Sequence, residues 1–220
     1  MKWVKAVICG ADLQQPLFYF IDNTNKFMAV YSKSKGEMKM LLEGKTVLIL
    51  ISDGYQEHEF WFPYYRFLEE GAEVIVAAPK AGTIYGEGRL GKDGLMAEAN
   101  ILISELPEKL PDILFLPGGM YSPMELRNIP AVQEYVKKCI DTGKLVCAIG
   151  HASWILVSAG VLNGRTVSCP NDISWDVTGV GAAFSQKAVT LDSNILTAEY
   201  FARLPEMFRM LFQEGIKVIL

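Results

Sequence analysis

Soft metal ligands are scarce in this sequence of 220 residues. The chain contains two histidines and four cysteines, namely His58, His151, Cys9, Cys139, Cys147 and Cys169. None of them follows the short spacings that are typical of zinc sites, so we expect no bound metal. Few cysteines without a disulfide-like pattern favour reduced thiols and a cytoplasmic location.

Long apolar runs and a basic stripe are also missing. The longest apolar runs, such as Thr46 to Ile51 and Ile113 to Leu116, are far too short to span a bilayer. No cationic stretch followed by an apolar run opens the chain, so we expect no secretory signal. The formal net charge is −4, and basic residues do not cluster. We therefore expect neither a membrane nor a nucleic acid as partner.

Half of the residues are hydrophobic, which is enough for one substantial core. From Lys45 onward, short apolar runs alternate with helical patterns, and such alternation predicts a mainly parallel sheet with helices on both faces. The expected strands are Thr46 to Ile51, Glu73 to Ala78, Ile113 to Leu116, Lys144 to Ile149, Arg165 to Ser168 and Ile195 to Ala198. The expected helices are Glu57 to Glu70, Ala131 to Thr142, His151 to Ala159 and Pro205 to Glu214. In the first helix, Phe60, Tyr64, Phe67 and Leu68 have the spacing of a core-facing stripe.

Residues 1 to 43 have a different pattern from the rest. Trp3 to Ile8, Leu17 to Ile21 and Phe27 to Tyr31 are β-prone, and Asp22 to Asn25 supplies a turn between the last two. We therefore predict an N-terminal β extension over 1–43 and an α/β domain over 44–220.

One stretch spells a dinucleotide-binding fingerprint, from Gly86 to Gly91. That motif requires a helix directly after it, but Lys92 to Gly94 has the composition of a further turn. A glycine-rich β-hairpin explains the stretch better, and we expect no cofactor.

The segment from Leu145 to His151 runs from an apolar strand into a helix with almost no loop. Such a turn strains the residue at its apex and directs its side chain over the sheet edge, as nucleophile elbows do. Gly150 occupies the apex, where glycine adopts a positive φ without a Cβ penalty. Taken alone, this turn favours the simpler reading, in which Gly150 only eases a tight turn.

The stretch Gly143 to Gly164 resembles the elbow of the ThiJ/PfpI superfamily, which is class I glutamine amidotransferase-like. The resemblance covers about residues 45 to 215 and implies a flavodoxin-like three-layer sandwich. Counting back from Ser158-Ala159-Gly160 aligns His151 with the family histidine, Gly150 with the family nucleophile and Ala152 with the following glycine.

Two further segments match family motifs. Asp53 to Tyr64 resembles the segment that carries an acidic residue beside the nucleophile, and Glu59 falls on that position. Pro117-Gly118-Gly119 resembles the turn whose N–H groups form the oxyanion hole, and the resemblance assigns Ala152 to the same oxyanion or ligand-binding site. Some family members borrow an acidic residue from a neighbouring subunit, for which Glu125 is the nearest candidate here. A solvated glutamate is the alternative reading of Glu125.

The resemblance implies that a cysteine thiolate attacks a carbonyl, assisted by the histidine and the glutamate. Gly150 has no side chain, so this covalent chemistry cannot start from its position. Cys169 follows a predicted strand, and the segment Cys169 to Asp172 resembles a loop that borders the family pocket. Cys169 is therefore a candidate for a relocated nucleophile, although the sequence favours an ordinary half-buried cysteine. Cys147 is expected to point into the core.

Three hypotheses follow from the glycine at residue 150, where the family has its nucleophilic cysteine. The first is a pseudoenzyme that binds a small-molecule ligand. The second is an intracellular protease-like hydrolase, amidase or glyoxalase/deglycase-like enzyme that uses Glu59, His151 and possibly Cys169. The third, compatible with the first, is an oligomeric module whose β extension builds an interface. The first ranks slightly above the second, and family resemblance implies a homo-oligomer.

Overall fold

The computed structural model describes residues 18–21, 27–30, 40–88 and 94–219. The chain divides into two compact units, Met1–Lys39 and Met40–Leu220. In the first unit, β1 (Phe18–Ile21) pairs antiparallel with β2 (Phe27–Val30). Two of the predicted N-terminal strands are thus present, whereas the predicted strand Trp3 to Ile8 and the turn at Asp22 to Asn25 lie outside the described residues.

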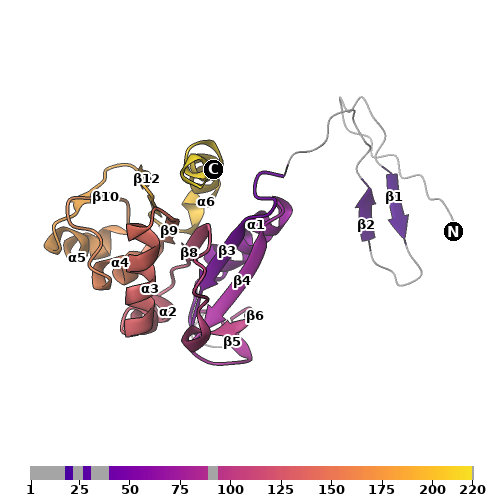
Figure 1. Cartoon of the computed structure of the whole chain (residues 1–220), viewed down its shortest axis with the longest axis horizontal. Helices are drawn as coiled ribbons and strands as arrows, with labels where there is room; N and C mark the ends of the chain where they lie inside the picture. The colour runs from indigo at the N-terminus through magenta and orange to yellow at the C-terminus, as the bar shows by residue number, and fades with distance from the viewer. Residues whose placement is uncertain (1–17, 22–26, 31–39, 89–93, 220) are drawn as a thin grey trace. The chain divides into compact units, whose positions relative to one another are not determined.

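A seven-stranded sheet forms the centre of the second unit, with the strand order β12-β13-β9-β8-β3-β4-β7 (Figure 1). Its strands are β3 (Thr46–Leu50), β4 (Glu73–Ala78), β7 (Ile101–Leu102), β8 (Ile113–Leu116), β9 (Leu145–Ile149), β12 (Val189–Asp192) and β13 (Ile195–Ala198). All neighbours are parallel except the edge pair of β12 and β13. The mainly parallel sheet predicted from the sequence is therefore confirmed.

Helices cover both faces of this sheet (Figure 1). They are α1 (Glu57–Glu69), α2 (Tyr121–Leu126), α3 (Pro130–Asp141), α4 (Ser153–Ser158), α5 (Ser174–Gly179) and α6 (Leu204–Gln213). Alternate residues of each strand serve opposite cores: Val47 and Ile49 pack with α1 and α6, whereas Leu48 and Leu50 pack with α3 and α4. Because successive side chains of a strand point to opposite faces, continuous apolar runs build two cores at once.

Two details of the α/β unit differ from the prediction. β10 (Thr166–Val167) pairs with β11 (Ala183–Phe184) in a separate two-stranded sheet, so it does not close the central sheet as predicted. Leu68 is 44% exposed, because Phe60, Pro63 and Phe67 already fill the buried face of α1.

The glycine-rich stretch after residue 85 joins β5 (Thr83–Tyr85) to β6 (Met96–Glu98), which pair antiparallel. The predicted hairpin is therefore present, although residues 89–93 of its connection lie outside the described part. No helix in the described part of the chain is long and apolar enough to cross a membrane.

Candidate functional site at the end of β9

The elbow begins where β9 ends. Gly150 to Ala152 form a single 3₁₀ turn that leads directly into α4. Gly150 is buried and has a φ of +61°, a region that L-residues with a side chain rarely adopt. The tight apex with a positive φ, expected from the sequence, is therefore present at Gly150.

The carboxyl group of Glu59 lies directly beside this apex. A Cβ atom built on Gly150 would be 3.0 Å from Glu59 Oε2 and 3.2 Å from Oε1. Glu59 belongs to the first turn of α1, where its N–H donates to the Gln56 side chain, which caps the helix, at 2.9 Å. The cap fixes the start of α1 and with it the backbone position of Glu59.

Burial dominates the chemistry of Glu59, which is only 2% exposed. Desolvation raises the pKa of its carboxyl group from 4.5 to about 7, and the nearby charge of Glu87 adds to this shift. Hydrogen bonds from the backbone at Gly118 and Phe201 oppose it. Glu59 can therefore hold or release a proton near neutral pH.

The Pro117-Gly118-Gly119 turn contacts Glu59 through its backbone. The N–H of Gly118 donates to Glu59 Oε2 at 2.9 Å, and the carbonyl of Gly118 accepts from the N–H of Gln56 at 3.0 Å. Gly119 has a φ of +97°, and a Cβ atom there would lie 2.5 Å from Gly54 O. The sequence assigned Gly118 to an oxyanion hole, but its N–H already has the Glu59 carboxyl as acceptor. The oxyanion role of Gly118, Gly119 and Ala152 stays a prediction.

His151 is held at the rim of the elbow. Its Nε2 lies 3.1 Å from Asp172 Oδ2, and its ring is 4.9 Å from the ring of Trp154. The sequence pointed only to the segment Cys169 to Asp172 as a border of the pocket and did not foresee that Asp172 orients the histidine. A carboxylate that bonds one ring nitrogen fixes the orientation of an imidazole.

The thiols are placed poorly for nucleophilic attack. Cys169 is 1% exposed, and burial raises its pKa to about 12, with a further contribution from Asp172, Asp176 and Glu199. Cys147 is fully buried within β9, and burial raises its pKa as well. Reactive cysteines need the opposite environment, one that stabilises the thiolate.

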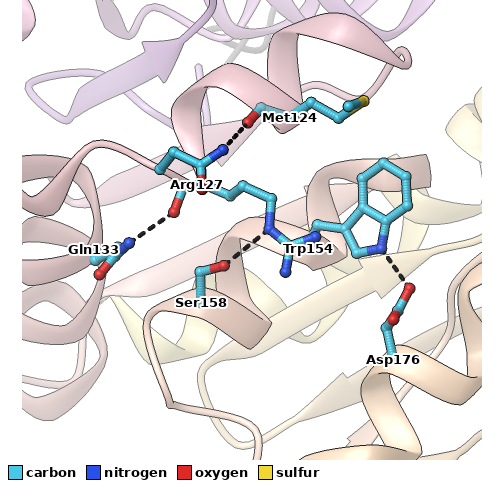
Figure 2. Close-up of a pocket in the computed structure, with 7 residues that line it drawn as sticks. Met124, Arg127, Gln133, Trp154, Ser158 and Asp176 are labelled. Atoms are coloured by element: carbon cyan, nitrogen blue, oxygen red, sulfur yellow. Dashed lines mark hydrogen bonds between the residues drawn. The ribbon is translucent and has the colours of Figure 1, made fainter.

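The remaining candidates lie away from the apex. Glu125 is exposed on α2 and lines a small cavity of about 50 Å³ with Asp53 and Lys80. A separate, larger pocket lies between α2, α3, α4 and α5, and Trp154 lines it (Figure 2). Within residues 40–88 and 94–219, no three His, Cys, Asp or Glu side chains form a group that could hold a metal ion.

Several known proteins are similar to this chain in sequence. The chain is 34% identical over 173 residues to a deglycase of Pyrococcus abyssi, covering 79% of this chain and 98% of the relative. It is 36% identical over 154 residues to a deglycase of Thermococcus kodakarensis, covering 70% and 89%. It is also 30% identical to protein/nucleic acid deglycase 2 of Escherichia coli, covering 80% and 98%.

Solved structures agree on the fold. The ThiJ/PfpI domain protein of Brachyspira murdochii has a TM-score of 0.69 at 23% identity, covering 79% of this chain and 95% of that one. DJ-1beta of Drosophila melanogaster has a TM-score of 0.70 at 20% identity, covering 80% and 93%. The family model described as DJ-1/PfpI family matches residues 45–214. The chain therefore belongs to the DJ-1/PfpI family, also called ThiJ/PfpI.

Proposed function

We propose that this chain is a family member without cysteine-dependent chemistry that binds a small ligand non-covalently at the elbow. The observation that carries the proposal is Gly150 at the apex of the elbow, beside the Glu59 carboxyl group. A glycine supplies no atom that could form a thioester or thiohemiacetal. The environment of Cys169 offers no substitute, because a buried thiol with a raised pKa is a poor nucleophile.

Ligand binding is supported by the state of Glu59. Below its pKa of about 7 the carboxyl group is neutral. A neutral carboxyl group donates one hydrogen bond, so it suits a ligand that presents a carbonyl or carboxylate oxygen. His151, fixed by Asp172, lies at the rim of the same site and offers a second polar contact.

A deglycase-like activity is the second candidate, and the names of the archaeal and bacterial relatives favour it. In this chain it would have to use Glu59 and His151 as acid and base. The two candidates differ in one measurable property: a ligand-binding protein shows no turnover, whereas the acid–base enzyme shows turnover that requires an ionisable side chain at Glu59.

A deglycase assay on the unaltered protein and on Gly150→Cys tests the proposal. The unaltered protein is expected to show no turnover. Gly150→Cys places a thiol beside Glu59, and we expect it to acquire turnover that iodoacetamide abolishes, at a stability cost of about 1–3 kcal/mol for a side chain at positive φ. Gly150→Ala is the matched control, because it adds the same backbone strain without a thiol.

Two outcomes of this assay would contradict the proposal. Turnover of the unaltered protein that iodoacetamide abolishes would mean that another cysteine acts as nucleophile. Turnover that survives iodoacetamide but is lost in Glu59→Gln would establish the acid–base enzyme instead.

We also propose that the chain forms a homo-oligomer. Several large apolar side chains of the α/β unit are at least 40% exposed, and such side chains mark an interface where they adjoin one another. They include Trp175, Tyr121, Leu95 and Phe201. Light scattering coupled to size-exclusion chromatography tests the proposal, and a monomeric mass at micromolar concentration would refute it.

A further inference from the structure

A pocket of about 600 Å³ lies where α2, α3, α4 and α5 of the α/β unit meet (Figure 2). A volume of this size suits a small molecule. Its lining residues are Met124, Arg127, Asn128, Gln133, Trp154, Ser158 and Asp176. The elbow residues Glu59, Gly150 and His151 do not line it, so its role is independent of the function proposed above.

Arg127 presents a preoriented guanidinium group to this pocket. Its Nε donates to Ser158 Oγ at 3.0 Å, and its guanidinium carbon lies 5.5 Å from the centre of the Trp154 ring (Figure 2). Its backbone carbonyl accepts from Gln133 Nε2 at 2.7 Å. Within the described ranges, its two terminal nitrogens have neither a hydrogen bond nor an ion pair. A guanidinium fork fixed in this way is ready to bind a carboxylate.

Asp176 supplies the opposite charge at the N–H edge of the Trp154 indole. Its Oδ2 accepts from Trp154 Nε1 at 2.7 Å, which fixes the position of the carboxylate (Figure 2). No lysine or arginine of the described residues forms an ion pair with it. An ionised carboxylate has about four acceptor positions, so one N–H donor leaves most of them available to a ligand.

Arg127 and Asp176 are the two charged residues among those that line the pocket. One cation over the face of an indole and one anion at its edge are complementary to a ligand with two opposite charges. A ligand with two negative charges gains from Arg127 but is repelled by Asp176. The apolar surface between the charges, from Trp154 and Met124, suits a short hydrocarbon chain.

We propose that this pocket binds an amino-acid-like zwitterion, with its carboxylate on Arg127 and its ammonium group on Asp176. Because the indole separates the two charged residues, the charged groups of the ligand stand at opposite ends of a chain. Terminal amino acids of this kind, and short peptides, form the ligand class.

Isothermal titration calorimetry on the unaltered full chain tests the proposal with four probes. These probes are ε-aminocaproate, glycine, caproate and hexylamine. We expect ε-aminocaproate to bind one site, and to bind about tenfold more tightly than caproate or hexylamine, since each of those lacks one charge. Glycine is expected to bind more weakly, because its charges are too close together. The proposal would be overturned if caproate or glycine bound as tightly as ε-aminocaproate. It would also be overturned if ε-aminocaproate gave no saturable heat.

Two variants locate the binding site. Arg127→Gln and Asp176→Asn are each expected to weaken the binding of ε-aminocaproate by about tenfold. Asp176→Asn retains an acceptor for Trp154 Nε1, so it removes the charge with little structural change. Arg209→Gln, on the exposed side of α6, is the matched control and is expected to leave binding unchanged. Thermal unfolding of each variant verifies its fold, and unchanged affinity in a folded Asp176→Asn would refute the site.

Discussion

At the scale of single residues, the elbow places the carboxyl group of Glu59, which binds a proton near neutral pH, beside Gly150, which has no side chain. Glu59 is 2% exposed and receives the Gly118 N–H at its Oε2. This bond and the backbone hydrogen bond at Phe201 offset only part of the desolvation cost of a buried carboxylate, so the neutral form persists to a pKa of about 7. No thiolate adjoins this carboxyl group at residue 150. Its protonation therefore depends on burial, on backbone contacts and on the charge of Glu87.

The raised pKa of Glu59 predicts how the stability of the protein changes with pH. The folded state binds the proton more tightly than the unfolded state, whose pKa is near 4.5. The stabilising contribution of the neutral group is therefore complete below pH 4.5, and it is lost as the pH rises to about 7. The shift corresponds to about 3 kcal/mol in total.

Urea unfolding of Glu59→Gln at a series of pH values measures this contribution. Glutamine cannot ionise, so we expect the variant to lack the decline in unfolding free energy that the parent shows over this pH interval. Glu206→Gln, an exposed residue of α6, is the control and should follow the parent. If the curves of Glu59→Gln and the parent stay parallel, the proton on Glu59 is not linked to folding.

At the scale of elements, the strands were predictable and the loop contacts were not. β4 and β8 have the predicted boundaries because apolar runs buried on both faces leave few alternatives. β10 was assigned to the wrong sheet because two residues carry no information about their partner strand. The contact between His151 and Asp172 joins residues 21 positions apart through the fold of a loop, and no periodic pattern encodes it.

The apex itself was predictable from chemistry, since a strand that turns directly into a helix requires a special backbone conformation. The pocket at Arg127 and Asp176 was not, because its residues come from four helices and the end of α2, and the packing of these helices depends on the whole fold.

The Pro117-Gly118-Gly119 turn lies so close to the elbow that a single methyl group added at Gly118 is expected to destabilise the fold. A Cβ atom on Gly118 would lie 2.5 Å from Glu59 Oε2 and 2.6 Å from the carbonyl oxygen of Ile149. Since the backbone on the Ile149 side has little room to move, we expect Gly118→Ala to reduce the unfolding free energy by about 2–4 kcal/mol.

Gly179→Ala is the matched control for this experiment. A Cβ atom on Gly179, at the end of α5, meets no atom within 4 Å, and its φ is not positive. We expect this variant to be as stable as the parent within about 0.5 kcal/mol. Equal stability of Gly118→Ala and Gly179→Ala in denaturant titrations would mean that the turn does not pack against the elbow as described.

At the scale of the whole molecule, the central sheet and its two cores belong to residues 40–220. Leu42 is fully buried in the core on the α1 and α6 side, and its N–H donates to the carbonyl of Glu70 at 2.8 Å. The sequence predicted a boundary between residues 43 and 44, because the strand–helix alternation begins at Lys45. That boundary would separate Leu42 from the core in which it packs.

Two truncated chains decide where the α/β unit begins. We expect residues 40–220 to unfold at the same temperature as the full chain, since both cores remain complete. Residues 44–220 lack Leu42, and the loss of a buried leucine costs about 2–4 kcal/mol, so we expect unfolding to occur roughly 5–10 °C lower. Calorimetry measures both temperatures, and light scattering of 40–220 shows whether the β extension contributes to assembly. If the number of chains per assembly is the same for residues 40–220 as for the full chain, the extension is excluded as an oligomer interface. If the two truncated chains unfold at the same temperature, Leu42 adds nothing to the stability of the core.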